Sequence, residues 1–508
     1  MLGGFMDYYK TIGCMPFEWK KKHPQNVAII HKNKSYTYED LHNISLSFAA
    51  YFATSGVKRG DHVLIMGKNS ADWLFAFFGL QMLGAVTVPV NPSYTTAEIA
   101  QIMNIVGAKY VVTNEFHDYA QQIKNIHKIS KDYTILYTNR GYQYSHLLTL
   151  KIHNQPEDVA CILLTSGTTG VPKGVQLTHI NLLHNAAKVS EITGWNDGDN
   201  FLLSVPLFHC FGLSATTLCA LMAGAKLTIL DSTKSSHLLA SIAQYHITVF
   251  NGVPALYLVA MRHNDLRHYD LSSLRSGIIA GSPLTSREYM AIKKNFGIKY
   301  LIQSYGQTET SPAITVVRPD EDDDIASVSV GTVIDDCEIA IVDDDLKPLP
   351  VGKAGNIVVR GKNVMRGYIN GKNTYTEKDW LCTGDIGLVD EKGHLFISGR
   401  TKDIIIRGGE NISALEIENV VKELDYVEQA RALAQKDPMM GEEVCLNVSL
   451  TDDRDPKEAE EAIREHLAER LVRYKMPKYI IIHHALPANG TGKIDDKALL
   501  CWMKQHLG

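Results

Sequence analysis

TSGTTGVPKG, residues 165–174, combines small hydroxyl side chains, glycines and a single lysine. A continuous apolar run at residues 159–164 precedes it and is typical of a buried strand. Thr178 follows it and is a suitable N-cap for a helix whose apolar spacing begins at Ile180. A glycine-rich loop between a strand and a helix can direct backbone N–H groups at a polyphosphate, and Lys173 adds a positive charge. We therefore predict a phosphate-binding loop in an α/β protein.

The spacing of this loop differs from that of a Walker A loop. A Walker A loop needs Gly, four residues and then Gly-Lys-Ser/Thr, whereas Lys173 lies between Pro172 and Gly174. On local sequence alone, a flexible surface turn rich in glycine and threonine remains the alternative.

Strand-like and helix-like segments alternate on both sides of the loop, which indicates parallel sheets covered by helices. Short alternating runs after about residue 314 indicate a β-rich subdomain, and the composition changes again at 399–409. We expect an α/β fold with a large N-terminal domain of layered α/β subdomains plus the β-rich subdomain (1–400) and a small C-terminal α+β domain (401–508). The expected strands are 63–66, 86–90, 110–113, 201–204, 226–230, 248–252, 276–280 and 300–304, and the expected helices include 71–83 and 96–106.

Two further segments carry local expectations. Residues 459–473 predict a charged amphipathic helix with Ile463, Leu467 and Leu471 on one face. The acidic run at 320–324 predicts a solvated loop.

Composition is typical of a globular protein. The 508 residues are 45% hydrophobic and 21% charged, with a formal net charge of -5. Lysine and arginine are dispersed, so we expect no nucleic-acid partner. The eight cysteines form no Cys-x-x-Cys pair, which argues against a zinc site or a disulfide framework and fits a reducing cytoplasm.

The sequence favours neither export nor a membrane span. The first 22 residues lack the charged start and apolar core of a signal peptide. Two long uncharged stretches, 73–90 and 204–225, are interrupted by Gly and Pro, and the first predicts a buried helix, a turn at Gly84 and a strand. We expect a cytoplasmic protein and leave peripheral membrane contact open.

Seven motifs in a fixed order extend over nearly the whole chain. With them the chain resembles the adenylate-forming (ANL) superfamily of acyl-CoA synthetases, and it looks closest to bacterial medium- or long-chain fatty acyl-CoA or aryl-CoA ligases. The resemblance implies that ATP, Mg²⁺ and a carboxylic acid give an acyl adenylate and pyrophosphate, after which the thiol of CoA takes the acyl group. The motifs are TSGTTGVPKG from Thr165, PLFHCFGL from Pro206, AGSPL from Ala280, SYGQTE from Ser304, WLCTGD from Trp380, GRTKDIIIRGGENIS from Gly399 and NGTGKI from Asn489.

The resemblance also implies roles for individual residues. Joining a carboxylate to the α-phosphorus brings two anions together, so the site must neutralise charge and hold both groups in line. Lys493 matches the lysine that bridges the acyl oxygen and the α-phosphate, and Glu309 matches the magnesium ligand. The catalytic set comprises Lys493, His209 and Thr308. The nucleotide set comprises Thr165, Ser166, Gly167, Thr168, Thr169, Gly170, Lys173, Gly281, Ser282, Pro283, Ser304, Tyr305, Gly306, Thr308, Asp385, Arg400 and Lys493.

Two of these nucleotide residues have ordinary alternatives. Tyr305 offers an aromatic face for adenine, although a buried core tyrosine would explain the local sequence nearly as well. Asp385 matches the acceptor for the ribose hydroxyls, yet a Thr-Gly-Asp turn alone would make it a turn former. Arg400 is expected at the same sugar.

The acyl and CoA ends of the reaction complete the set. His209 matches the aromatic position that guards the acyl pocket, with Cys210, Phe211, Ala280 and Gly281 as further walls, whereas a lone histidine in an apolar run is more often part of the core. Lys402 falls on the hinge about which the C-terminal domain turns, which makes that domain mobile. Gly408 and Gly409 match glycines that line the CoA tunnel, and a β-turn is their alternative role.

The leading hypothesis is a cytoplasmic ATP-dependent ligase that joins a fatty or aryl carboxylic acid to CoA. Residues 366–380 form a shorter connection than the resemblance implies and lack its Asn-Pro step, whereas 309–399 contain no large insertion, which favours CoA over a carrier protein. An adenylation enzyme that loads a carrier protein remains an alternative, and so does a catalytically idle sensor of nucleotide or acyl ligand. A homodimer is left open.

Overall fold

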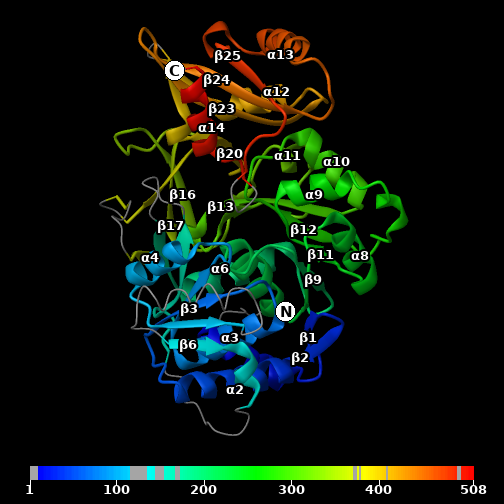
Figure 1. The fold of residues 1–508 in the computed structure, drawn as a ribbon, viewed down its shortest axis with the longest axis vertical. Coiled ribbons are helices and arrows are strands. Elements are labelled where there is room, and N and C mark those ends of the chain that lie inside the picture. Colours follow the sequence, from blue (N-terminus) through cyan, green and yellow to red (C-terminus); the bar gives the residue numbers. More distant parts are fainter. Residues whose placement is uncertain are drawn as a thin grey trace.

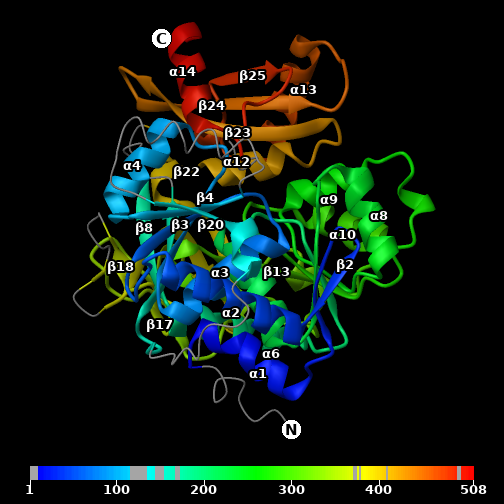
Figure 2. The same cartoon turned by 60° about the horizontal axis from the view of Figure 1, so that its bottom comes forward.

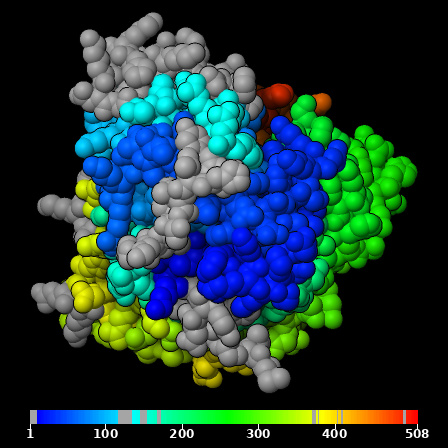
Figure 3. Space-filling view, turned by 90° about the horizontal axis from the view of Figure 1, so that it is seen from below, coloured from blue at the N-terminus to red at the C-terminus, as the bar shows by residue number. Residues whose placement is uncertain are grey.

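The computed structural model describes residues 10–114, 134–143, 154–165, 172–369, 375–376, 379–407, 410–488 and 493–507. In Figure 1 the C-terminal elements, orange and red, lie together at one end of a larger α/β body. Figure 2 shows the same elements above the large body from a second angle, and Figure 3 shows the opposite face, where N-terminal segments in blue lie beside the green segments.

The first large sheet carries the predicted phosphate loop. Its order is β18-β8-β7-β4-β3-β5-β6. Neighbouring strands from β7 to β6 are parallel, and β8 and β18 add to the edge in antiparallel fashion. The strands are β3 (His62–Met66), β4 (Val86–Val90), β5 (Tyr110–Thr113), β6 (Thr134–Tyr137), β7 (Val159–Thr165), β8 (Lys173–Thr178) and β18 (Gly367–Tyr368).

The second large sheet has the order β15-β14-β13-β12-β11-β9-β10-β1-β2 and is parallel from β13 to β1. Its strands are β1 (Val27–His31), β2 (Lys34–Thr37), β9 (Asn200–Leu203), β10 (Lys226–Ile229), β11 (Val249–Phe250), β12 (Ser276–Ile279), β13 (Tyr300–Gly306), β14 (Ala313–Val316) and β15 (Thr332–Val333). The helices of the large body are α1 (Met15–Lys22), α2 (Tyr38–Thr54), α3 (Ala71–Leu83), α4 (Thr96–Val106), α6 (His179–Thr193), α7 (Cys219–Met222), α8 (Ser235–Tyr245), α9 (Pro254–Met261), α10 (Ser286–Phe296) and α11 (Asp323–Ala326).

Two smaller sheets complete the fold. An antiparallel sheet consists of β16 (Cys337–Val342), β17 (Gly355–Gly361), β19 (Leu381–Val389) and β20 (Leu395–Arg400). The C-terminal body has its own apolar core and a sheet of β21 (Ile404–Arg407), β22 (Glu410–Ser413), β23 (Val427–Asp437), β24 (Gly441–Leu450) and β25 (Tyr479–His483), with helices α12 (Ala414–Val421), α13 (Pro456–Arg470) and α14 (Asp496–His506).

Local sequence signals set the helix ends. Among the described residues, four helices begin with a capping box, in which an N-cap threonine and the third helical residue exchange hydrogen bonds with each other's backbone N–H groups. Four of the described helices end at a glycine in the left-handed conformation, which glycine adopts without strain. The boxes are Thr37–Asp40, Thr95–Glu98, Thr178–Asn181 and Thr285–Glu288, and the glycines are Gly84, Gly107, Gly194 and Gly297.

Helix α3 explains the first long uncharged stretch. Nearly all of its residues are buried, and Gly84 turns the chain into the buried strand β4, as predicted. A side chain at Gly79 would lie 2.9 Å from Phe48 Cβ on α2, so the close packing of these two helices requires glycine. Within the ranges that the structure describes, no helix is long and apolar enough to cross a membrane.

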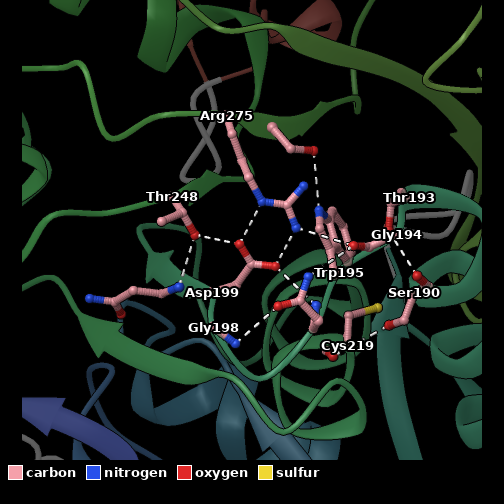
Figure 4. A network of polar contacts seen from close by, with 12 residues as sticks. Ser190, Thr193, Gly194, Trp195, Gly198, Asp199, Cys219, Thr248 and Arg275 are labelled. Carbon is pink, nitrogen blue, oxygen red and sulfur yellow. Dashed lines mark hydrogen bonds and ion pairs between the residues drawn. The ribbon is translucent and has the colours of Figure 1, made fainter.

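A buried ion pair joins the amino ends of three parallel strands (Figure 4). The Asp199 carboxylate, before β9, accepts hydrogen bonds from Thr248 Oγ1 at 2.7 Å, before β11, and from Arg275 Nε at 2.7 Å, before β12. The Asp199 side chain is 3% exposed. This network stabilises the side of the sheet at which the parallel strands begin. The site described below lies at the other side, where the carboxyl end of β13 leads into it.

Three local predictions differ from the structure. The loop at 165–174 was expected between a strand and a helix, but Lys173 begins β8, which pairs with β7, and α6 starts only at the far end of β8. The α6 terminus therefore cannot serve that loop, because the full length of β8 intervenes. Helix α13 ends at Arg470, so Leu471 is extended although it remains in the same core. The acidic run enters α11, and Glu321 contacts the buried His394.

Candidate active site

Glu309 lies in a short 3₁₀ turn, η6 (Thr308–Thr310), directly after β13. It is 9% exposed, and its Oε1 accepts a hydrogen bond from the Tyr368 hydroxyl at 2.7 Å. Its backbone carbonyl accepts from Met365 N at 2.8 Å. The turn is tight because β13 and β14 approach closely: a Cβ at Gly306 would lie 1.8 Å from the Pro312 carbonyl oxygen. Glu309 is therefore held by hydrogen bonds to both its side chain and its backbone.

Tyr368, which donates to this carboxylate, also lies next to Lys173. Strand β18 pairs with β8, and the Lys173 ammonium lies 4.9 Å from the centre of the Tyr368 ring. Burial, with the Glu309 carboxylate next to it, raises the pKa of Tyr368, so the hydroxyl stays protonated and donates. Tyr368 lies outside the seven motifs and was not among the predicted site residues. A tyrosine following Arg-Gly in an otherwise polar connection was the only local signal.

The other predicted nucleotide residues meet where β13 reaches the β19–β20 hairpin. Asp385 and Arg400 are opposite residues of that hairpin, and Arg400 Nε lies 2.9 Å from Asp385 Oδ1. The Tyr305 hydroxyl donates to Asp385 Oδ2 at 2.6 Å. Burial, followed by the Asp385 charge, raises the pKa of Tyr305 well above its ordinary value. Each carboxylate oxygen already accepts one bond, and each retains capacity for one more.

At the predicted acyl end, His209 and Cys210 precede a π-helical segment, η4 (Phe211–Leu218). Such segments are uncommon and often occur at functional sites. Cys210 Sγ lies 3.5 Å from Thr308 Oγ1, which places this end beside η6. Cys210 is buried, and burial raises the pKa of its thiol to about 11, so the thiol is neutral at physiological pH.

Lys493 comes to this site from the C-terminal body. Its charge lowers the pKa values of both His209 and Cys210, and the Lys493 side chain itself is exposed. Burial, and then the charge of Lys493, lower the pKa of His209 below its ordinary value of 6.5. The imidazole is therefore neutral at pH 7, and the ammonium of Lys493 is the positive charge at this end of the site.

Ion pairs across the two bodies accompany this placement. Arg262, at the end of α9, pairs with Glu428 of β23. Arg287 of α10 pairs with Asp425 and donates to the Glu423 carbonyl oxygen at 3.0 Å. Lys402 lies in the 3₁₀ turn η7 (Thr401–Asp403), which connects β20 of the large body to β21 of the C-terminal body.

The remaining predicted residues fall into three groups. Gly281, Ser282 and Pro283 are exposed just after β12, where Ala280 is partly buried, and Gly281 has a left-handed φ of 96°. Thr165, Ser304 and Phe211 are partly buried. The predictions that fall on Ser166, Gly167, Thr168, Thr169, Gly170, Gly408 and Gly409 lie outside the described residues.

The residues that meet here fit a magnesium–nucleotide complex. No group of three or more His, Cys, Asp or Glu among the described residues could hold a metal ion by itself. Mg²⁺ prefers oxygen ligands and is often bound by one or two carboxylates together with substrate phosphates. Glu309 and the Thr308 hydroxyl supply oxygen atoms of that kind, and the ammonium of Lys173, next to Tyr368, would offset phosphate charge.

Comparisons with known proteins agree with this geometry. A putative acyl-CoA synthetase, YngI, from Bacillus subtilis (strain 168) is 29% identical, with 96% of each chain covered. The 4-coumarate–CoA ligase CCL1 of Humulus lupulus is 32% identical, with 91% of this chain and 88% of that one covered.

Among solved structures, ATP-bound MatB from Rhodopseudomonas palustris is 25% identical and superposes with a TM-score of 0.88, covering 97% of this chain and 99% of that one. The apo form of MatB, with the same coverage, gives 0.79. Family models for the AMP-binding enzyme and for the AMP-binding enzyme C-terminal domain match residues 17–369 and 416–493. The chain therefore belongs to the AMP-binding enzyme family.

Proposed function

We propose that the protein is an ATP-dependent acid–CoA ligase that converts a fatty or aryl carboxylic acid to its acyl adenylate with release of pyrophosphate and then transfers the acyl group to CoA. The observation that supports this proposal is that the charge of Lys493 reaches His209 and Cys210, and Cys210 lies 3.5 Å from Thr308, which shares a turn with Glu309. A reaction between two anions requires a positive charge between them, and Lys493 of the C-terminal body would supply it.

The chain's own residues account for the first step. Lys493 neutralises charge on the acid and the α-phosphate, and Thr308 donates to phosphate from η6. Lys173, together with Thr165, Ser166, Gly167, Thr168, Thr169 and Gly170, holds the leaving pyrophosphate. Glu309 would hold Mg²⁺, which offsets phosphate charge when it is bound with ATP.

The nucleoside and the acid occupy opposite ends of the site in this proposal. Asp385 accepts from the ribose hydroxyls, Arg400 contacts the same sugar, and the face of Tyr305 stacks on adenine. Gly281, Ser282, Pro283, Ser304 and Gly306 complete the nucleotide site. Neutral His209 borders the acyl pocket with Cys210, Phe211, Ala280 and Gly281, and a neutral ring suits an apolar acyl chain or aryl ring.

The second step needs a different domain arrangement. We place the boundary between domains 1–400 and 401–508, with the hinge at Lys402. Thiol attack on the adenylate requires Lys493 to leave and a channel for the CoA arm to open, which Gly408 and Gly409 would line. The closer superposition on ATP-bound MatB than on apo MatB supports an adenylation arrangement for the present conformation.

The expected cellular location is the cytoplasm. All eight cysteines are unpaired in the structure, as befits a reducing compartment. Peripheral membrane contact and a homodimer remain compatible with this location.

The test is a pyrophosphate-release screen over short, medium, long and aryl acids, with and without CoA. We expect release that depends on the acid and a thioester when free CoA is present. Lys493→Ala should lower adenylate formation about 10²–10³-fold, in the range found when one stabilising donor is removed, while sparing thioester formation from supplied acyl adenylate. Transfer only to a carrier protein would identify the carrier-loading alternative. Absence of acid-dependent pyrophosphate release would instead favour the catalytically idle sensor of nucleotide or acyl ligand.

A further inference from the structure

Arg431 of β23 is surrounded by three carboxylates. Its Nε and one terminal nitrogen donate to the two oxygens of Asp496 at 2.7 and 2.6 Å, so this pair is bidentate. The same terminal nitrogen also donates to Asp403 Oδ2 at 3.2 Å, and the other terminal nitrogen donates to Glu418 Oε1 at 3.0 Å. The Arg431 side chain is 15% exposed, so the network is largely shielded from solvent.

The three carboxylates come from three separate parts of the C-terminal body. Asp403 is the last residue of η7, which contains Lys402. Asp496 is the first residue of α14 and lies three positions after Lys493. Glu418 belongs to α12, is 6% exposed, and also accepts from Ala432 N at 3.0 Å. A single guanidinium therefore connects the turn between the two bodies with the residues that follow the lysine.

Residues 493–496, called here the lysine segment, are fixed at their C-terminal end. Ile494 forms a backbone bridge with Ala488, and Asp495 N donates to the Pro487 carbonyl oxygen at 2.8 Å. The Asp495 carboxylate caps α14 by accepting from Lys497 N and Ala498 N. These contacts are local, whereas the Arg431–Asp496 pair joins the lysine segment to the central sheet.

We propose that Arg431 is a positioning residue for adenylation, because it holds the lysine segment in a fixed place relative to η7. The inference rests on the proposed function, in which Lys493 acts on the acid and the α-phosphate. With Arg431 in place, a rotation at the hinge carries Lys493 to the nucleotide in one defined geometry. Removing Arg431 would release that constraint and leave Asp496 as an uncompensated anion three residues from the Lys493 ammonium.

The charge balance supports this role. Three acidic side chains face one arginine, and burial is the largest influence on the pKa of Glu418, which it raises, while Arg431 opposes that shift. The carboxylates in turn raise the pKa of Arg431 despite its burial. A guanidinium suits the position because its five N–H donors are spread over three nitrogens in a fixed planar fork, whereas an ammonium is a single point charge with three donors on one nitrogen.

The variants for the test are Arg431→Met, Arg431→Lys and Asp496→Asn, each compared with Arg454→Met. Arg454 is a suitable control because it also makes a bidentate pair in the C-terminal body, with Asp452, and touches neither η7 nor the lysine segment. Each variant is assayed for acid-dependent pyrophosphate exchange, for thioester formation from supplied acyl adenylate, and for thermal midpoint.

We expect Arg431→Met and Asp496→Asn to lower the kcat of adenylation about 10–100-fold, as small misplacements of a reacting group do, with KM values for ATP and acid little changed. Thioester formation from supplied adenylate should stay within about twofold of the unsubstituted protein, because that step does not use Lys493. Arg431→Lys should be intermediate, and Arg454→Met should match the unsubstituted protein.

Equal loss in both half-reactions, or no loss in adenylation, would overturn the inference. If Arg431→Met does not fold, the same comparison is made with Asp496→Asn, which keeps the shape of the side chain and removes only its charge. Absence of pyrophosphate exchange in the unsubstituted protein would instead contradict the proposed function, so the two failures are distinguishable.

Discussion

At the scale of single residues, Tyr368 is the group that the motifs do not reveal. It donates to Glu309 at 2.7 Å, and its ring lies under the ammonium of Lys173. We predict that Tyr368→Phe, which keeps the ring and removes the hydroxyl, weakens the apparent affinity for Mg²⁺ about tenfold, since partners that orient a ligating group commonly contribute that much. The measurement is the Mg²⁺ dependence of pyrophosphate release.

Tyr289→Phe is a matched control for this substitution. The Tyr289 hydroxyl also makes a buried hydrogen bond, to the Leu301 carbonyl oxygen at 2.6 Å, but it lies on α10 away from Glu309. Its Mg²⁺ dependence should be unchanged. An equal shift in both variants would show that the effect is one of general packing.

His209 allows a prediction about protonation. Burial and then Lys493 lower its pKa, so folding favours the neutral ring, and the associated stability is present above pH 6.5 and is lost as pH falls through the lower, folded pKa. Lys493→Ala should raise the pKa of His209 without bringing it to 6.5, because burial is the larger cause. Histidine NMR titration, assigned with His209→Gln, measures this.

The exposed Lys497, in the first turn of α14, provides the comparison. Lys497→Ala should leave the His209 titration where it is. An unchanged pKa in Lys493→Ala would mean that the lysine does not occupy the site in solution.

At the scale of elements, the Asp199–Arg275 pair stabilises the amino edge of the second large sheet (Figure 4). Asp199→Asn leaves the guanidinium without its counter-charge, and we expect the free energy of unfolding to fall by about 3 kcal/mol, at the low end for a buried pair because Arg275 is partly exposed. Glu338→Gln, which breaks an exposed pair with Arg360 between β16 and β17, should lower the free energy of unfolding much less, because solvent screens that pair. Denaturant unfolding of both variants measures the loss in the free energy of unfolding. Equal losses would contradict this assignment.

Much of the element order could be predicted from periodicity and capping. The helix at 71–83 and the strands at 86–90 and 110–113 were predicted at the bounds of α3, β4 and β5, because uninterrupted apolar runs and terminal glycines leave little choice. The hairpin of β7 and β8 was not predicted. The six residues of β8, which begins at Lys173, have the same apolar content as the start of a helix. Only the pairing of β8 with β7 distinguishes the two.

The candidate site shows the same limit. Glu309, Asp385 and Lys493 could be selected from motifs, whereas the contacts that orient them come from segments remote in sequence. Tyr368 lies 59 positions from Glu309, and Tyr305 lies 80 positions from Asp385. Such partners depend on how β18 meets β8 and how β13 meets the β19–β20 hairpin, which single-sequence patterns do not encode.

At the scale of the whole molecule, exposed ion pairs are among the contacts between the C-terminal body and the large body, together with a hydrogen bond from Ser413 Oγ to the Ser398 carbonyl oxygen. Arg262–Glu428 and Arg287–Asp425 bridge the two bodies, with side chains between 36% and 89% exposed. Each such pair contributes about 0–1 kcal/mol. Ion pairs this weak can define an arrangement without trapping it, which suits the proposed turn of the C-terminal domain between the two steps.

We predict that Arg262→Ala/Arg287→Ala slows adenylation by up to about tenfold, since two such pairs together favour this arrangement by no more than about 1–2 kcal/mol. Thioester formation from supplied adenylate should be equal or faster, because the competing arrangement gains population. The defect should shrink at high ionic strength, where screening weakens the same pairs in the unsubstituted protein. Arg59→Ala, which breaks the exposed Arg59–Asp158 pair within the large body, should leave both rates unchanged. A salt-independent defect, or a parallel fall in both half-reactions, would show that these arginines act on the stability of the large body and do not set the balance between its two arrangements.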